Sequence, residues 1–217
     1  MSVLCVYLRG PEGSVFDSYA IRFLTSYLSH PAGAEHELRM VPNATNIDIG
    51  IFQRIAREES ADRIMFLGSY ARVRYDDWLA KHLDAIEPDD VAMVAPNGSW
   101  EQGYSTRLPN PHLRTSNFMV KPALLNALGL PVYTDKRECY EFEHGDASVY
   151  RQFTDAGLRC LVVGQECSYG ERAWPDSGTF RVPGQPNLLI ADKQSDAYDA
   201  AGPDEKRDLE RRAWSAS

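Results

Sequence analysis

The sequence predicts an α/β fold with a mostly parallel central sheet, and three observations predict it. Short apolar runs alternate with longer amphipathic segments along the chain. The first five elements read as strand, helix, strand, helix and strand, an order that favours parallel pairing with right-handed crossovers. The run at residues 64–67 is apolar throughout and is flanked by charged residues. A strand buried on both faces of an open sheet has this pattern, so we expect residues 64–67 to form the central strand.

The first half of the chain supplies the elements around that strand. Residues 3–8 predict a buried strand because the run is apolar and β-branched and is followed by a turn rich in Gly and Pro, and residues 37–41 predict a short second strand that ends at Pro42. Ser14 or Asp17 could cap the helix between them. One face of that helix carries Phe16, Ala20, Phe23, Leu24, Tyr27 and Leu28. A second helix is expected to start at residues 46–48 and a third at residues 76–77.

The second half continues with more turns. Strands are expected at residues 91–95, 118–120 and 158–163, with a further apolar run at 187–191, and helices at 121–128 and 147–156. Pro122 suits the first turn of a helix and Gly157 suits a helix end. Residues 1–200 are therefore predicted to form one domain. Residues 201–217 form a charged C-terminal tail, either a surface helix or a frayed end.

Composition excludes several classes of protein. Hydrophobic residues make up 43% and aromatics 11%, which is enough for a packed core. The net charge of -8 argues against a nonspecific nucleic-acid binder, although a local cationic pocket for a phosphorylated small molecule stays possible. No apolar run reaches the ~18 residues of a membrane span, and Arg9 and Glu12 interrupt the apolar start, so no signal peptide is expected. The four cysteines form no CxxC pair, and we expect Cys5 and Cys160 to be buried, reduced thiols of a cytoplasmic protein.

The end of the central strand is the first candidate for a ligand site. In open α/β sheets, ligands bind just beyond the carboxyl ends of the strands. The run at 64–67 stops at Gly68 and Ser69, whose small size lets a ligand approach the backbone, and Arg72 and Arg74 follow. The alternative interpretation is an ordinary loop beside a core strand.

A series of short motifs extends this interpretation. They lie at residues 46–50 (NIDIG), 66–72 (FLGSYAR), 78–79 (WL), 94–101 (VAPNGSWE), 112–119 (HLRTSNFM), 140–145 (YEFEHG) and 185–192 (QPNLLIAD). In this order the chain resembles the nucleotide-sugar glycosyltransferases of the GT-A fold, in particular small bacterial and phage-type members of the inverting kind. The resemblance covers residues 3–199. It implies a three-layer sandwich that moves a sugar from a nucleotide-diphosphate-sugar donor to a hydroxyl of a glycan or protein acceptor.

The chain departs from that family at one place. The central strand of the family usually ends in an Asp-x-Asp-like motif, whose carboxylate holds a divalent metal on the donor diphosphate. Here Ser69, Tyr70 and Ala71 stand at that place, and a metal needs hard anionic oxygen ligands. The resemblance therefore leaves three outcomes open. Donor binding is metal-independent, or Mn²⁺ or Mg²⁺ is held by residues that the sequence does not identify, or catalysis is lost. Without a metal, Arg72, Arg74 or Arg114 could neutralise the leaving diphosphate.

Sugar transfer with inversion needs a base that takes the proton of the acceptor hydroxyl. The resemblance places a carboxylate just ahead of a helix near the acceptor. Glu143 and Asp146 both fit this spacing, and we prefer Glu143 because Asp146 could simply cap the helix. His144 could orient the acid or titrate near neutral pH, although a lone histidine is more often structural.

The other candidate residues divide between donor and acceptor. The predicted donor contacts are Arg9, Asp48, Gly68, Ser69, Tyr70 and Arg72. Asp48 could instead be a helix cap and Arg9 a solvated arginine. The predicted acceptor or sugar contacts are Trp100, His112, Arg114 and Asn117, together with Thr115. Trp100 would stack on a sugar face or cover the core. Gln185, Asn187 and Asp192 could form a late-chain lid.

Two other readings compete with glycosyl transfer. A catalytically silent sugar- or nucleotide-binding module is the main rival, because the family's metal-binding carboxylates are missing. A doubly wound enzyme such as a methyltransferase would carry a Gly-rich turn after the first strand, and residues 9–13 (RGPEG) are not G-x-G-x-x-G.

Overall fold

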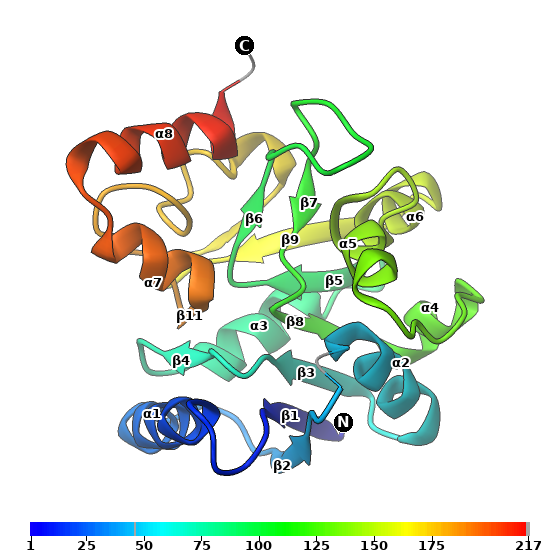
Figure 1. The fold of residues 1–217 in the computed structure, drawn as a ribbon. Helices are drawn as coiled ribbons and strands as arrows, with labels where there is room; N and C mark the ends of the chain where they lie inside the picture. The colour runs from blue at the N-terminus through cyan, green and yellow to red at the C-terminus, as the bar shows by residue number, and fades with distance from the viewer. Residues whose placement is uncertain (46, 216–217) are drawn as a thin grey trace.

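In the computed structural model, seven strands form one sheet with helices on both of its faces (Figure 1). The structure describes residues 1–45 and 47–215. In chain order the strands are β1 (Val3–Arg9), β2 (Glu37–Pro42), β3 (Arg63–Leu67), β5 (Val91–Ala95), β8 (Asn117–Val120), β9 (Arg159–Val163) and β10 (Ser168–Tyr169). Across the sheet they are ordered β10-β9-β5-β8-β3-β1-β2.

The sheet is mostly parallel, which confirms the expectation. β1 pairs in parallel with β2 and β3, and β5 pairs in parallel with β9. β3 was expected to be the central strand but lies one place from the middle, which β8 occupies. β8 runs antiparallel to both of its neighbours, β3 and β5, while β10 runs antiparallel to β9 at the edge. The chain passes from β5 to β8 through residues 96–116, which are all described and contain no helix. A parallel connection usually carries a crossover helix, and the helix-free connection before β8 agrees with its antiparallel direction.

The helices and the minor strands complete the chain. The helices are α1 (Phe16–Ser29), α2 (Asp48–Glu58), α3 (Trp78–Ile86), α4 (Pro122–Ala127), α5 (Lys136–His144), α6 (Val149–Asp155), the 3-10 helix η1 (Glu171–Ala173), α7 (Lys193–Ala200) and α8 (Pro203–Trp214). Outside the large sheet, β4 (Arg72–Val73) pairs with β11 (Ile190–Ala191), and β6 (Gly98–Ser99) pairs with β7 (His112–Leu113). In the part of the chain that the structure describes, no helix combines the length and the apolar character needed to cross a bilayer.

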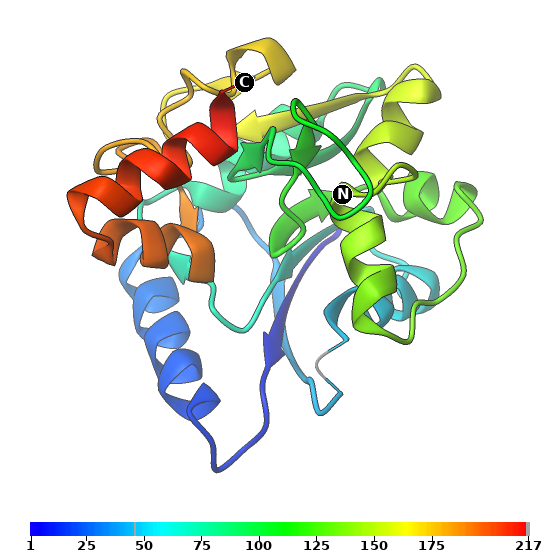
Figure 2. The same cartoon turned by 45° about the horizontal axis from the view of Figure 1, so that its top comes forward.

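Alternate residues of the inner strands supply two separate cores. Cys5 and Tyr7 of β1 point into a core shared with α1 and α3. Leu4 and Val6 point the other way, into a core shared with α2, α4, α5 and α6. Figure 2 shows α1 on one side of β1 and α2 with α4 and α5 on the other. The predicted three-layer sandwich is therefore confirmed, and Cys5 is a buried free thiol as expected.

Three local expectations differ from the structure. Leu28 was placed on the apolar face of α1 but is 79% exposed, because the face that packs on the sheet is carried by Ala20 and Phe23. Val15, rather than Ser14 or Asp17, occupies the N-cap position of α1, although Oγ of Ser14 accepts a hydrogen bond from the amide of Phe16 over 3.2 Å. The third helix starts after Asp77 rather than with it. Asn46, expected to help start α2, lies outside the described residues.

α5 was expected only as the approach to the next helix. Its start is fixed by a capping box: the Asp135 carboxylate accepts a hydrogen bond from the Glu138 amide, and the Glu138 carboxylate accepts one from the Asp135 amide. Glu143 consequently lies in the last turn of a helix, not in a loop ahead of one.

α8 occupies most of the predicted charged tail and packs on the rest of the chain. The backbone amide of Trp100 donates a hydrogen bond to the carbonyl of Ala213 over 3.0 Å. Nε1 of Trp214 donates to the carbonyl of Phe180, also over 3.0 Å. Of the two alternatives for the tail, the described residues form the surface helix. The boundary at residue 200 stays a prediction.

Candidate active site

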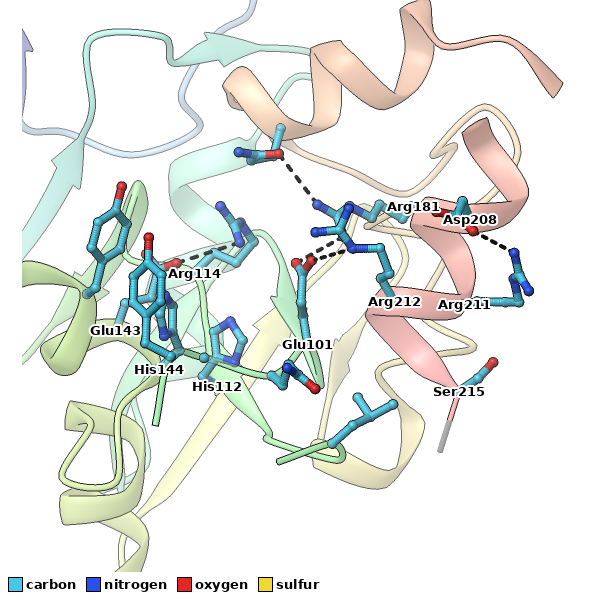
Figure 3. A pocket seen from close by; sticks show the side chains of 16 residues that line it. Glu101, His112, Arg114, Glu143, His144, Arg181, Asp208, Arg211, Arg212 and Ser215 are labelled. Atoms are coloured by element: carbon cyan, nitrogen blue, oxygen red, sulfur yellow. Dashed lines mark hydrogen bonds and ion pairs between the residues drawn. The ribbon is translucent and has the colours of Figure 1, made fainter. Parts of the chain in front are cut away.

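A pocket of about 860 Å³ lies between α5, the segment that joins β6 to β7, and α8 (Figure 3). Its lining residues come from distant parts of the sequence: Glu101, Gln102, Gly103, Tyr104, Leu108, His112, Arg114, Tyr140, Glu143, His144, Arg181, Gln194, Asp208, Arg211, Arg212 and Ser215. The size is typical of ligand-binding pockets, which measure roughly 300–1,000 Å³. Glu143, the preferred candidate for the catalytic base, is part of its wall.

Backbone, hydroxyl and guanidinium groups hold Glu143. Its Oε2 accepts hydrogen bonds from the amide of Thr115 (3.0 Å) and from Thr115 Oγ1 (2.7 Å). Its Oε1 lies 3.6 Å from Nη1 of Arg114. Burial by itself would raise the pKa of Glu143, but Arg114, His112 and the Thr115 hydrogen bond outweigh it and lower the pKa to about 2. Glu143 is therefore an ionised carboxylate at neutral pH.

Arg114 connects Glu143 to the start of α7. Its Nε lies 3.5 Å from Oδ2 of Asp192, and the same oxygen accepts a hydrogen bond from Oγ of Ser116 over 2.6 Å. The other oxygen of Asp192 accepts hydrogen bonds from two backbone amides and caps α7. The Arg114 guanidinium also lies over the ring of Phe180, 5.1 Å from its centroid. Arg114 thus holds two carboxylates at once.

Two histidines lie beside Glu143. His112 is buried, and its Nδ1 donates a hydrogen bond to the carbonyl of Asn110 over 2.8 Å, because a carbonyl can only accept. This leaves the Nε2 lone pair of the neutral ring free to accept. Burial lowers the pKa of His112 to about 4, so the ring is uncharged at neutral pH. The ring of His144 lies 5.6 Å from that of His112 and stacks on Tyr140.

The expected donor edge lies at the carboxyl end of β3. The amide of Gly68 donates to the carbonyl of Ser116 over 2.8 Å, and a Cβ at position 68 would lie 2.8 Å from that oxygen. The close approach therefore requires glycine. Ser69 is buried, and its carbonyl accepts a hydrogen bond from the hydroxyl of Tyr7 over 3.0 Å.

The remaining donor candidates surround this edge. The ring of Tyr70 packs on two aromatic rings of α1. Arg72 forms an ion pair of 2.7 Å with Asp196 of α7. Arg9 ends β1 and pairs with two acidic side chains of the segment that follows. Asp48 is the first residue of α2 and accepts a hydrogen bond from an asparagine side chain.

Polar contacts join the donor edge to the acid. Gly68 contacts Ser116, Ser116 contacts Asp192, Asp192 contacts Arg114, and Arg114 contacts Glu143. Both groups of predicted residues therefore lie at the same end of the sheet. Of the described residues that line the pocket, none belongs to residues 68–72, so the donor edge adjoins the pocket through these contacts.

Three predicted residues have structural contacts of their own. Trp100 packs edge-to-face on Trp214, with ring centroids 6.1 Å apart. Asn117 is buried, and its Oδ1 accepts a hydrogen bond from the amide of Gly68 over 3.2 Å. Asp146 is exposed and lies 3.7 Å from Nη1 of Arg151.

Comparison with known proteins identifies the fold. No protein-family model and no curated protein matches the chain. A crystal structure of a variant of Drosophila β-1,4-galactosyltransferase 7, in complex with manganese, UDP-Gal and xylobiose, matches 100% of this chain and 82% of its own, with a TM-score of 0.51 and 10% identity. GalNAc-T7 with UDP, GalNAc and Mn²⁺ matches 96% of this chain, which spans 51% of that longer one, with a TM-score of 0.51 and 12% identity.

The chain has the GT-A fold. The expected resemblance is confirmed at the level of the fold.

The two GT-A structures contain manganese, but the residues beyond β3 in this chain do not form a ligand set for a divalent metal. Ser69, Tyr70 and Ala71 carry no carboxylate. Asp192, the nearest acid along the contacts described above, uses its oxygens for the α7 cap, Ser116 and Arg114. Among the described residues, no group of three or more His, Cys, Asp and Glu is arranged to hold a metal.

Several lining residues were not expected from the sequence. Tyr140 could have been found together with Glu143 and His144, because helical spacing places residues three and four apart on one face. Because α5 was not predicted as a helix, the helical spacing of these residues was not recognised. Arg181 and the arginines of α8 carry no local signal, since only the packing of α8 brings residues 211 and 212 opposite Glu143 (Figure 3).

Proposed function

We propose that this protein is a glycosyltransferase that moves a sugar from a nucleotide-diphosphate-sugar to a hydroxyl group of a glycan or protein, with inversion. The observation that supports this most is the position of Glu143, an ionised carboxylate on the wall of a ligand-sized pocket, four polar contacts away from the end of β3. In the proposal the donor lies along residues 68–72, with Arg9 and Asp48 at its nucleotide end. The acceptor occupies the pocket.

The reaction would proceed by direct displacement. The acceptor oxygen forms a bond to the anomeric carbon, the bond from that carbon to the diphosphate oxygen breaks, and the hydroxyl proton passes to Glu143. The nucleoside diphosphate leaves with the electron pair. Arg114 is the cation nearest to Glu143, and in the proposal it moves toward the leaving diphosphate. That movement would also raise the pKa of Glu143, so donor binding would turn a weakly basic carboxylate into a better base.

The test is turnover of a panel of nucleotide-sugars, with and without Mn²⁺. We expect at least one donor to be hydrolysed or transferred, and the Glu143→Gln variant to lose about 10²–10⁴-fold in rate. Glu141→Gln is the matched control, because Glu141 lies on the same helix and does not line the pocket. Equal losses in both variants would contradict the assignment of Glu143.

A silent binding module of the same fold is the second candidate. The absence of a carboxylate after β3 and the full pairing of Asp192 favour it. Tight binding of a nucleotide-sugar, seen as a rise in melting temperature, without turnover of any donor would favour the module over the enzyme.

A further inference from the structure

The pocket has two chemically different walls. One wall comes from α5 and the segment after β6 and carries Tyr104, Tyr140 and His144 beside Glu143. The opposite wall carries Arg181 and two arginines of α8, Arg211 and Arg212. Figure 3 shows Glu143 and His144 facing Arg181 and Arg212 across the pocket, with Arg114 and Glu101 between them. A ligand that fills the pocket therefore meets aromatic rings on one side and guanidinium groups on the other.

The aromatic wall is open to solvent. Tyr104 is 80% exposed and Tyr140 is 40% exposed. Their ring centroids are 5.4 Å apart, with the rings nearly perpendicular. Tyr140 in turn stacks on His144, with an angle of 27° between the rings. Large exposed rings at the edge of a pocket suit the apolar face of a sugar ring. They are better placed for this than Trp100, whose ring packs on Trp214.

The arginine wall has more positive charge than its two carboxylates neutralise, because Asp208 pairs with Arg211 over 2.5 Å and leaves Glu101 for both Arg181 and Arg212. Glu101 is shared by two guanidinium groups: its Oε2 lies 2.9 Å from Nη1 of Arg181, and its Oε1 lies 3.4 Å from Nε of Arg212. The Arg181 side chain is only 4% exposed, and its Nε has no hydrogen-bond partner among the described residues. Arg212, in contrast, is largely exposed, and no ion pair of its two terminal nitrogens is found in the described part of the chain.

The guanidinium groups also repel each other. Burial lowers the pKa of Arg181, and the neighbouring charges of Arg114 and Arg212 lower it further, against the opposing effect of Glu101. An anion bound between Arg181 and Arg212 would reduce this repulsion. The charge is a local feature, because the whole chain carries a net charge of -8.

We propose that the pocket binds an acidic saccharide, with its ring on Tyr104 and Tyr140 and its carboxylate or phosphate group on Arg212. Arg181, which is paired with Glu101, adds its positive charge from the buried side of the pocket. The opposite end of the sugar ring then presents a hydroxyl to Glu143. The assignment of this saccharide as the acceptor rests on the proposed function, whereas its binding does not.

The test measures binding without any donor. Glucuronate, glucose 6-phosphate and neutral glucose are titrated into the full-length protein and followed by NMR, which detects dissociation constants in the millimolar range. We expect at least one of the two acids to bind about 10-fold more tightly than glucose, and added salt to weaken that preference. Tighter binding of glucuronate would indicate recognition of a carboxylate, and tighter binding of glucose 6-phosphate would indicate recognition of a phosphate.

Two matched variants locate the binding. Arg212→Gln should lose the preference for the acid and bind it about as weakly as glucose. Arg207→Gln should keep the preference, because Arg207 lies on the same helix, is exposed, and does not line the pocket. Tyr140→Ala should weaken the acidic and the neutral sugar alike, whereas Tyr140→Phe should preserve binding.

Three results of the sugar titrations would overturn the proposal. They are equal affinity for glucose and both acids, loss of preference in Arg207→Gln to the same extent as in Arg212→Gln, and binding of none of the three sugars. Displacement of the bound acid by UDP would assign the arginines to the donor and would also overturn it. Because no turnover is measured, an inactive protein that still prefers the acid would contradict only the proposed glycosyl transfer.

Discussion

At the scale of single residues, Arg114 connects the two halves of the candidate site. It lies 3.6 Å from a carboxylate oxygen of Glu143 and 3.5 Å from one of Asp192, and its side chain is 12% exposed. In the proposed mechanism, the Arg114 guanidinium leaves Glu143 and pairs with the leaving diphosphate. The change in the basicity of Glu143 therefore depends on this one side chain. Its effect on Glu143 can be measured in the free protein, before any donor is known.

We expect Arg114→Gln to raise the pKa of Glu143 from about 2 toward its ordinary value, because Arg114 is the strongest of the charges that lower it. The measurement is a carboxyl-carbon NMR titration of Glu143. Arg114→Lys keeps the positive charge and should keep the pKa low. An unchanged pKa in Arg114→Gln would mean that the histidines and the Thr115 hydrogen bond hold the carboxylate in its ionised form without Arg114.

Site residues that stand in a cluster of polar residues could be predicted from the sequence. Residues whose role depends on tertiary contacts could not. His112 and Arg114 were candidates because several polar groups at the start of a strand are difficult to explain by packing. Glu143 was a candidate because the resemblance places a carboxylate ahead of a helix, and the structure brings all three residues together. Trp100 carried the same weight in the sequence, yet its contact partner Trp214 lies 114 positions further along the chain. No local pattern reveals such a contact.

At the scale of elements, α8 is the part of the molecule whose contribution is least visible in its composition. Its residues are mostly charged, but its last turn buries Ala213 and places Trp214 between Trp100 and Phe180. The same helix carries the arginines that face Glu143. The stability of the chain and the shape of the pocket should therefore both depend on this one turn.

We expect Trp214→Ala to lower the free energy of unfolding by about 3 kcal/mol, since it removes a large, mostly buried ring and the hydrogen bond from Nε1 to the carbonyl of Phe180. Urea denaturation measures this change. Arg207→Ala, at an exposed position of the same helix, should change the stability by less than about 0.5 kcal/mol. If the two variants were equally stable, α8 would not be part of the cooperative unit.

Element prediction succeeded where apolar runs were continuous and failed where helices are short and polar. The inner strands were found within a residue or two, because a strand buried on both faces must be apolar throughout. α5 has few apolar side chains and buries only Cys139 and Phe142. Its capping box at Asp135 and Glu138 was the available signal.

At the scale of the whole molecule, two buried histidines make the folded state sensitive to acid. His82 lies in α3 and His112 in β7, and burial lowers the pKa of each to about 4 from an ordinary value of 6.5. Between these pH values the unfolded chain binds protons that the folded chain does not. The stability that each neutral ring contributes is present above pH 6.5 and is lost as the pH falls toward 4.

We expect the free energy of unfolding to fall between pH 6.5 and 4 by up to about 1.4 kcal/mol per pH unit for each of the two histidines. Glu143, with its lowered pKa, adds a further loss below pH 4.5. Denaturation at a series of pH values measures the slope. His82→Leu should reduce the slope of the free energy of unfolding between pH 6.5 and 4 by the contribution of one histidine. An unchanged slope in His82→Leu would show that buried His82 does not contribute to it.

The class of fold followed from the sequence, because alternating runs leave few topologies and the right-handed crossover rule selects among them. The position and the antiparallel direction of β8 could not be predicted, because the residue types at 117–120 do not indicate in which direction a strand pairs. That information lies in the connection before it, which contains no crossover helix.

The antiparallel middle strand also affects how the chain can be synthesised. β2, β1 and β3 are complete once residue 67 has left the ribosome, but the inner edge of β3 has no partner until residues 117–120 arrive. About 50 residues, or several seconds of translation, separate the two events. During that time an apolar edge strand is open to pairing with other chains, and a truncated product that ends before residue 117 keeps that edge permanently.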